Sequence, residues 1–418
     1  MKKGLRIGLA VVMIVSVMSL GLIGCAKEEP TPTKPTPVAP APTPAPEEVY
    51  KIKYSFGSAV KPGYPFGERL SYLIAVDSLE AASDGRIDID VYGGGSLHAH
   101  KKAISAVRSG ITDVSTATPM YEPEYLPFND VWCLPGLYLT SEEGVLLYCQ
   151  TFKKFFKKDF DRAGIVNLTP STWSAYVVFS VKKPVRTVED FKGLTIRVAG
   201  KVPGMLMEEL GAMPITVPYM DIYEALSKGI IEAVTLPILW PYRLHHTDLG
   251  KPGYLSICGL PGSATASVTR PDVIDSLPPD LQEIFKESWF YWQTWYFNQC
   301  YDAQDSLLAD MYTDAGIEVI RWSYEDRLGY EPANEAVYEW FYEQMEEKYG
   351  RGDEARAYVE TIKRLYTKLE LGPRSPLPPE VGKHFEGYDE AAWKDIYLTT
   401  GMPYKGWCTM DDLPEEPE

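Results

Sequence analysis

The chain has 418 residues and a formal net charge of −17 at pH 7, and hydrophobic residues make up 45% of it. The acidic balance argues against nucleic acid as a partner, because phosphate binding needs clustered Lys and Arg. It also disfavours non-specific adhesion to anionic lipid. The hydrophobic content is ordinary for a globular protein and is sufficient for a large core.

The beginning of the chain is typical of a secretory signal. A basic start precedes an apolar segment, residues 7–23, that contains no charge. This segment is slightly shorter than the ~20 residues that a membrane-spanning helix needs. It leads into residues 22–25, LIGC, which resemble the bacterial lipobox, whose cysteine receives lipid and becomes the mature N-terminus. We therefore predict a lipoprotein signal peptide over residues 1–24 and lipidation of Cys25, with an uncleaved membrane anchor as the alternative.

The segment that follows cannot build a core. Residues 30–46 are almost only Pro, Thr, Ala and Val, a composition that favours extended polyproline II geometry. We predict that residues 25–48 contain the lipidated cysteine and a Pro-rich tether, which would hold the folded part at the outer face of the cytoplasmic membrane or in the periplasm. The remaining part, about 370 residues, suggests two domains or one large one.

The first part of the folded region alternates strands and helices. Apolar and polar residues alternate at 50–56 and at 87–91, which indicates two strands. Helical spacing predicts helices over 66–82 and 99–109, and a short third strand follows at 114–117. This order of elements implies a parallel sheet with helices on its faces.

A similar order recurs later in the chain. The predicted strands are 195–199, 215–217 and 233–236, and the predicted helices are 203–210 and 221–228. The segments 104–114 and 223–234 align as helix, Gly, Ile, acidic residue and apolar strand, although a shared βαβ pattern alone produces some of this similarity. We therefore predict two α/β lobes of like build.

Two such lobes would face each other across a cleft. Ligands bind beyond the carboxyl ends of parallel strands, and closure of the lobes over a solute would be a hinge motion. The strand-like segments 166–172 and 255–268 are the predicted hinge. The predicted lobe I comprises residues 49–171 and about 265–310.

The last part of the folded region reads as helical, with predicted helices at 281–311, 333–349 and 355–369. The aromatic residues of the first helix, including Trp289, are interpreted as core packing. Residues 172–264 and about 311–370 would form lobe II and the spanning helices. Residues 371–418 are proline-rich and are predicted to form an irregular C-terminal extension.

The sequence contains no strong catalytic or metal-binding motif. The five cysteines after Cys25 have irregular spacing and no CxxC pair, which leaves disulfides and buried free thiols both open. His98 and His100 are separated by one residue but have no paired acidic motif, so a solvated loop is expected. No GxSxG, HExxH or Walker loop is present. We expect no catalytic residue, no metal and no cofactor; a secreted glycoside hydrolase and a ligand-sensing binding protein are the alternatives.

Two stretches of the sequence resemble a known family. The first reads LEAASDGRIDIDVYGGGSL at residues 79–97 and AVRSGITD at 106–113. The second reads KPVRTVEDFKGLTIRV at 183–198, followed by LGAMP at 210–214 and YEALSKG at 223–229. Together they resemble the DctP family, the extracytoplasmic solute-binding subunits of tripartite ATP-independent periplasmic (TRAP) transporters.

This resemblance covers about residues 50–350 and implies a fold and a function. It implies a two-lobed periplasmic-binding-protein-like α/β fold with hinge strands, a long helix across both lobes and a helical C-terminal part. It also implies that the chain binds a small organic acid and delivers it to a membrane permease that an ion gradient drives. The arginine that the resemblance places against the ligand carboxylate is Arg197.

The residues around Arg197 support the same role independently. Arg197 interrupts the apolar strand 195–199 near its carboxyl end. A guanidinium group matches a carboxylate through two parallel hydrogen bonds, and burying it without an anion would be unfavourable. An internal ion pair with an Asp or Glu is the alternative.

The chain also departs from the family pattern. Tyr176 stands where many members have a second arginine, and Thr235 stands where one keto-acid subgroup has a cation-binding Glu. We therefore predict a monocarboxylate ligand with an apolar or aromatic body rather than a dicarboxylate or sialic acid. The predicted aromatic walls, for which core packing is the alternative, are Trp173, Tyr176, Tyr219 and Trp240. The candidates from the first lobe are Ser58, Leu97 and Tyr121.

Overall fold

The computed structural model describes residues 48–56, 68–169, 171–217, 219–249, 252–291, 308–368 and 410–415. The predicted signal peptide, the predicted lipidation site Cys25 and the predicted tether up to residue 47 lie outside the described residues, as do Ser58 and most of the predicted C-terminal extension. Within the described ranges, no helix combines the length and the apolar character needed to cross a membrane.

The first sheet has six strands in the order β2-β1-β3-β11-β4, with β5 paired to β11. Strand β1 is parallel to β2 and β3, and β11 is antiparallel to β3, β4 and β5. The strands are β1 (Tyr50–Phe56), β2 (Ile87–Tyr92), β3 (Val114–Ala117), β4 (Val166–Asn167), β5 (Ser171–Thr172) and β11 (Ala264–Thr269). The helices around this sheet are α1 (Glu68–Ala82), α2 (Ala103–Arg108), α3 (Ser141–Thr151), α4 (Lys157–Ala163), α8 (Pro271–Asp275) and α9 (Pro279–Tyr291).

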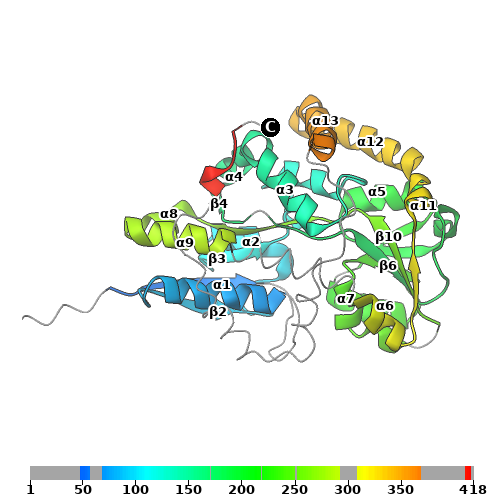
Figure 1. Cartoon of the computed structure of the whole chain (residues 1–418), viewed down its shortest axis with the longest axis horizontal. Coiled ribbons are helices and arrows are strands. Elements are labelled where there is room, and N and C mark those ends of the chain that lie inside the picture. The colour runs from blue at the N-terminus through cyan, green and yellow to red at the C-terminus, as the bar shows by residue number, and fades with distance from the viewer. Residues whose placement is uncertain are drawn as a thin grey trace, which may run out of the picture. The chain divides into compact units, whose positions relative to one another are not determined.

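The second sheet also has six strands, in the order β12-β10-β6-β9-β7-β8. Strand β7 is parallel to β8 and β9, and β6 is antiparallel to β9 and β10. The strands are β6 (Tyr176–Ser180), β7 (Thr195–Val198), β8 (Met213–Thr216), β9 (Ala233–Leu236), β10 (Tyr254–Leu260) and β12 (Glu318–Arg321). The helices that follow its strands are α5 (Lys201–Glu209), α6 (Ile222–Ser227), α7 (Leu239–Arg243) and α11 (Tyr324–Leu328). Figure 1 shows β3 and β4 on the left with α1, and β6 and β10 on the right with α5 and α6.

The two sheets repeat one arrangement, as the sequence predicted. In each, the first strand of the repeat lies between the other two, and an antiparallel strand is added beside the third. The helix before the third strand ends in each case at a glycine in the left-handed region, Gly110 with φ 76° and Gly229 with φ 69°. A residue without a Cβ adopts this conformation at no steric cost. We call the elements around the first and second sheets lobe I and lobe II.

Two of the crossings between the lobes lie next to each other. Strand β5 leads from lobe I into β6, and β10 leads from lobe II back into β11. The crossings touch, because Thr172 in β5 pairs with Ala264 in β11. They approach so closely at Gly262 that a Cβ there would lie 2.7 Å from the carbonyl oxygen of Trp173. The strand-like segments predicted for the hinge therefore lie where the sheets join.

The helical C-terminal part spans both lobes. Helix α9 packs against α1 in lobe I, and Trp289 is buried there, which confirms its predicted core role. The chain is helical again at 308–314, but residues 292–307, where the predicted long helix would continue, lie outside the described residues. Helices α12 (Glu331–Tyr349) and α13 (Gly352–Lys368) form a hairpin in which α12 packs on α5 of lobe II and α13 on α3 of lobe I.

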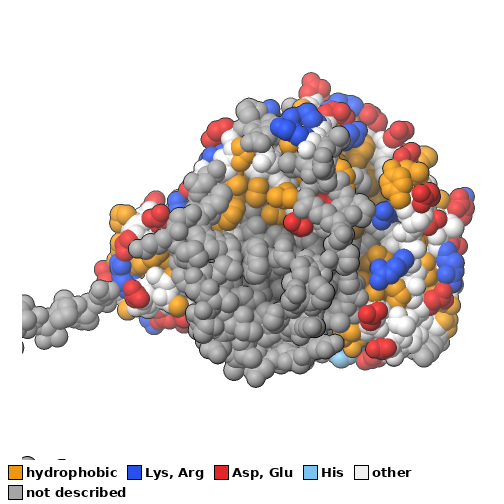
Figure 2. Space-filling view, viewed as in Figure 1, with side chains coloured by type: hydrophobic (Ala, Val, Ile, Leu, Met, Phe, Trp, Pro, Cys, Tyr) orange, Lys and Arg blue, Asp and Glu red, His pale blue; other side chains and the backbone are white. Residues whose placement is uncertain are grey.

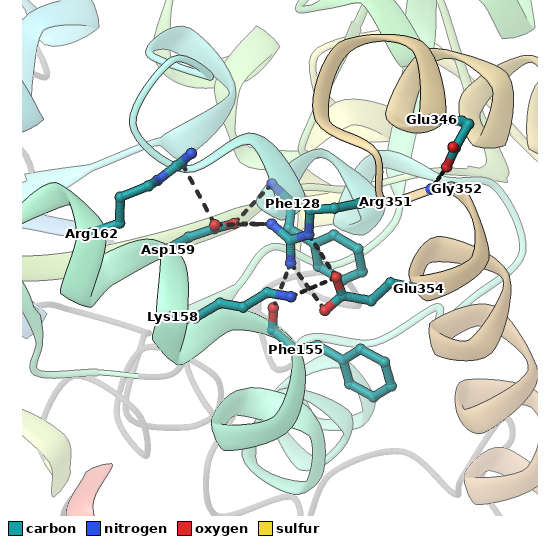
Figure 3. Close-up of polar contacts among 9 residues, drawn as sticks. All are labelled: Phe128, Phe155, Lys158, Asp159, Arg162, Glu346, Arg351, Gly352 and Glu354. Atoms are coloured by element: carbon teal, nitrogen blue, oxygen red, sulfur yellow. Dashed lines mark hydrogen bonds and ion pairs between the residues drawn. The ribbon is translucent and has the colours of Figure 1, made fainter.

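Polar contacts fix the C-terminal part to lobe I. Arg351, between α12 and α13, contacts Asp159 in α4 and lies over the ring of Phe128 (Figure 3). The short described piece of the extension, 410–415, contains a 3₁₀ turn, and its Asp411 forms an ion pair of 2.7 Å with Lys286 of α9.

Candidate ligand-binding site

A pocket lies between the lobes at the carboxyl ends of their parallel strands. Phe56 and Thr116 reach it from the ends of β1 and β3, and Arg197 and Leu236 reach it from β7 and β9. The pocket encloses about 700 Å³ of empty space, counting the part that is open to solvent. This is the place where two facing α/β lobes are expected to hold a small molecule.

Most of the predicted site residues line this pocket. The lining includes Arg197, Trp173, Tyr176, Tyr219, Trp240 and Tyr121. Leu97 is partly buried but is not among the lining side chains. Leu97 lies just before the short 3₁₀ turn η1 (His100–Lys102). His100 of that turn, and not Leu97, lines the pocket.

Arg197 is buried in the floor of lobe II without an acidic partner. Its side chain is 3% exposed, and β7 holds it between β8 and β9. The Nε atom donates a hydrogen bond of 3.2 Å to the carbonyl oxygen of Val217. No Asp or Glu of the described ranges forms an ion pair with it, so the internal salt bridge considered from the sequence is not observed. The guanidinium can therefore receive an anion from solution.

Aromatic rings form the wall around Arg197. The rings of Trp173 and Trp240 lie 5.9 Å apart, and Tyr219 meets Trp240 edge to face at 5.1 Å. The guanidinium of Arg243 stacks on Trp240 at 4.8 Å. This wall offers flat apolar surface to a ligand, and the stacked cation adds positive potential behind it.

Lobe I places two histidines near the pocket, and the prediction of a solvated loop is wrong for His100, whereas His98 is partly exposed. His98 Nε2 lies 2.7 Å from Ser55 Oγ, which fixes the ring against the end of β1. His100 lines the pocket, where its ring meets Tyr121 edge to face at 5.5 Å. Burial, and secondarily the neighbouring His98, lowers the pKa of His100 to about 4, so its imidazole is neutral at pH 7.

The charge of the pocket differs from that of the surface. On the face drawn in Figure 2, acidic and basic side chains are interspersed over the described surface. The pocket wall, in contrast, contains one arginine and no Asp or Glu among the described residues. The same part of the chain contains no group of three His, Cys, Asp or Glu side chains placed to hold a metal ion. The geometry suits an anionic organic molecule.

Comparison with known proteins decides the family. Residues 56–345 match the model of the DctP family, described as bacterial extracellular solute-binding protein, family 7. The chain belongs to this family. Its members are binding proteins, and the two-lobed fold described above is that of solute-binding proteins of TRAP transporters.

The relatives of this solute-binding protein are distant. A solute-binding protein of Albidiferax ferrireducens is 29% identical over 44% of the chain and 54% of its own length. The C4-dicarboxylate-binding protein DctP of Rhodobacter capsulatus is 24% identical over 55% of the chain and 68% of its own length. The match thus spans about half to two thirds of these relatives.

Solved structures of relatives share this fold over their whole length. A TRAP solute-binding protein of Rhodoferax ferrireducens, crystallised with benzoate, has a TM-score of 0.68 and 18% identity, and the match covers 77% of this chain and all of that one. A marine metagenome relative that is specific for aromatic acids also has a TM-score of 0.68.

The solute-binding protein contains a second buried histidine, behind the site rather than in its wall. His246 in lobe II is 1% exposed and packs against Phe179, and within the described part of the chain neither ring nitrogen has a hydrogen-bond partner. Burial, followed by the charges of Arg197 and His245, lowers its pKa to about 4. The neutral ring is therefore the form compatible with the fold.

Because the pKa of His246 is lowered, we expect the protein to lose stability in mild acid. Because its pKa is lower in the folded than in the unfolded chain, the unfolded chain binds more protons between pH 6.5 and 4, and stability falls as the pH falls through that range. A pKa shift from 6.5 to about 4 corresponds to about 3 kcal/mol. We expect His246→Leu to reduce the slope of unfolding free energy against pH, measured by urea denaturation, without loss at pH 7. An unchanged slope would contradict the prediction.

Proposed function

We propose that this protein is the extracytoplasmic solute-binding subunit of a TRAP transporter, which captures a small organic monocarboxylate between its lobes and delivers it to the membrane permease. The observation that supports this most directly is the burial of Arg197, whose guanidinium has no acidic partner among the described residues and lines a pocket whose described wall has no Asp or Glu. A buried charge of this kind is stabilised when an anion reaches it.

The free side of the guanidinium defines how the ligand would bind. Val217 occupies Nε, which leaves the two terminal nitrogens for the ligand. A carboxylate fits such a pair through two parallel hydrogen bonds. Since Arg197 belongs to lobe II and Thr116, Thr118 and Tyr121 belong to lobe I, a molecule held by Arg197 would contact both lobes and favour their closure.

The wall supports a ligand with an apolar or aromatic body. Trp173, Tyr219 and Trp240 would contact the body of the molecule, and Tyr176, whose hydroxyl lies 2.9 Å from Ser263 Oγ, would add a further ring. A second carboxylate would find no second cation in the described wall. We therefore favour a monocarboxylate over the dicarboxylate named for the Rhodobacter relative.

The same proposal includes membrane attachment and the absence of catalysis. Lipid on Cys25 would hold the protein at the membrane. The tether at 25–48 would let the folded part reach the permease. Within the folded part, lobe I and lobe II would be divided as predicted from the sequence. A glycoside hydrolase needs a pair of carboxylates at its site, which the described wall does not offer. The bound molecule would be released unchanged.

A thermal-shift screen of the purified full chain tests the proposed function. We expect aromatic and aliphatic monocarboxylates, such as benzoate and cyclohexanecarboxylate, to stabilise the protein by ~2.7 kcal/mol when present at 100 times the dissociation constant. Dicarboxylates and neutral sugars should give no shift, and NMR after long incubation should show the acid unchanged. Stabilisation by sugars alone, or conversion of the acid, would refute the proposal.

A further inference from the structure

Several polar groups of the pocket wall already have partners within the protein. The hydroxyl of Tyr176 lies 2.9 Å from Ser263 Oγ, and the hydroxyl of Thr116 lies 3.0 Å from that of Tyr54. A hydroxyl that already has a protein partner has part of its hydrogen-bonding capacity in use, so it gains less from a ligand than a buried group without a partner does. These hydroxyls therefore contribute less to selectivity than such a group would.

His100 is different, because one of its ring nitrogens has no partner. Its Nδ1 atom is buried and makes no hydrogen bond within the described part of the chain. Its Nε2 atom has only a long contact, 3.4 Å, with Thr118 Oγ1. A buried polar atom without a partner is unfavourable and rare in folded proteins. In a side chain that lines a ligand pocket, such an atom indicates a group that the ligand supplies.

Arg197 and His100, two described wall residues with hydrogen-bonding capacity left for a ligand, lie on opposite lobes. Arg197 extends from β7 in lobe II, whereas His100 lies in the turn η1 of lobe I. They also differ in charge, since the guanidinium is a cation and the imidazole, with a pKa that burial lowers to about 4, is neutral at pH 7. A ligand that satisfies both must carry an anion at one end and an uncharged polar group at the other.

We infer that His100 binds a hydroxyl group of the ligand, so that the protein selects a hydroxylated monocarboxylate with its hydroxyl and carboxylate at opposite ends. The inference rests on the proposed function, in which Arg197 holds the carboxylate. A carboxylate without the hydroxyl would bind to lobe II but leave His100 unsatisfied in the closed pocket.

The chemistry of a neutral imidazole favours a hydroxyl over other polar groups. One ring nitrogen donates and the other accepts, and a hydroxyl can do both, so it fits whichever nitrogen carries the proton. A second carboxylate would lose its hydration beside a neutral ring with no cation to compensate. A sugar acid would bring several hydroxyls, while His100 offers one free nitrogen and the facing wall is aromatic.

Calorimetry with matched ligands tests this role of His100. The ligands are benzoate with its 3- and 4-hydroxy derivatives, and cyclohexanecarboxylate with the corresponding hydroxy acids, all titrated into the purified full chain. We expect one hydroxylated isomer to bind about tenfold or more tightly than its parent, because the parent leaves a buried nitrogen unsatisfied. His100→Phe should abolish the preference, so that the hydroxylated and the parent acid bind with equal affinity.

Two further variants serve as controls. His100→Gln keeps an uncharged donor and acceptor, so it should retain a preference for the hydroxylated acid, and it provides a second measurement if His100→Phe does not fold. His245→Phe makes the same replacement at an exposed position outside the pocket wall and should leave the preference unchanged.

The outcomes separate this inference from the proposed function. Equal binding of parent and hydroxylated acids to the natural protein, or a preference that persists in His100→Phe, would overturn the role of His100. Tighter binding of succinate or glucuronate than of every acid with one hydroxyl would overturn it as well. Failure of the proposed function would instead appear as no carboxylate binding at all, or as binding that Arg197→Met does not change.

Discussion

Replacing Arg197 with methionine is expected to weaken carboxylate binding by about 2–5 kcal/mol, or roughly 30-fold to several thousand-fold in dissociation constant. The arginine is 3% exposed and faces a pocket whose described wall has no other charged side chain. In the variant, a carboxylate would lose its hydration and gain no cation in return. Isothermal titration with the acid that gives the largest thermal shift measures the loss.

Two other substitutions control for charge and geometry. Arg197→Lys keeps the charge but loses the planar fork, so an intermediate loss of affinity is expected. Arg186→Met removes an arginine of the same lobe that is 51% exposed and pairs with Glu318 on the surface, and it should leave binding unchanged. If Arg186→Met weakened binding as much as Arg197→Met, the general positive potential of lobe II, and not a direct contact, would explain both results.

Arg197→Met should weaken ligand binding, but it should not destabilise the ligand-free protein. Because no acidic side chain of the described residues pairs with Arg197, its burial is unfavourable until a ligand arrives, and an apolar side chain of similar length removes that penalty. We expect the ligand-free variant to be at least as stable as the natural protein in urea denaturation. A loss of several kcal/mol without ligand would show that Arg197 has a structural role instead.

Much of the fold could be predicted from the sequence because local patterns specify it. Alternating apolar residues place β1 and β2 within a residue of their observed bounds, and Gly110 and Gly229 mark the ends of the helices that precede the third strand of each repeat. The pairing of β11 with β3 follows from no local pattern, since it joins segments about 150 positions apart, as Ala266 and Ala117 show. The sequence therefore predicts the order of elements within each lobe better than the pairing of strands that lie far apart in the chain.

The candidate site could be predicted only where a residue's position along a strand or the family resemblance indicated its role. Arg197 and Tyr121 lie at or just beyond strand ends, which is where parallel sheets hold their ligands. Position made Tyr121 a candidate, whereas for Arg197 the family resemblance was needed to favour a ligand over an internal ion pair. His100 was assigned to a solvated loop because its burial depends on Tyr121 and Thr118, which reach it through tertiary packing. Its place after the end of β2 was the signal that could have identified it.

The contacts that fix the helical hairpin to lobe I are a further feature that the sequence did not reveal. Arg351 and Asp159 are 192 positions apart, yet Arg351 Nη1 donates to both carboxylate oxygens of Asp159, at 2.9 and 2.8 Å. The same guanidinium donates to Glu354 at 2.6 Å and to the carbonyl oxygen of Phe155 at 3.1 Å, and it stacks on Phe128 (Figure 3). The arginine thus connects four segments at the turn between α12 and α13.

Arg351→Met is expected to destabilise the protein by about 3–5 kcal/mol, because it removes one partner of a buried ion pair. The side chain of Asp159 is only 4% exposed, and its remaining partners would be Arg162 at 3.5 Å and the backbone nitrogen of Phe128 at 3.3 Å. Urea denaturation measures the loss. Ligand binding should change little, since Arg351 lies at the hairpin and not in the pocket wall.

Arg356→Met provides a control with the same chemistry at the surface. Arg356 also donates to both oxygens of a carboxylate, that of Glu339, and also stacks on a ring, that of Tyr342, but its side chain is 48% exposed. Because exposed ion pairs contribute little, we expect a much smaller loss of stability than for Arg351→Met. Equal effects of the two substitutions would mean that burial at Asp159 does not set the strength of the contact. A larger effect at Arg351 would show that this buried pair holds the hairpin to lobe I, while α12 also packs on α5 of lobe II.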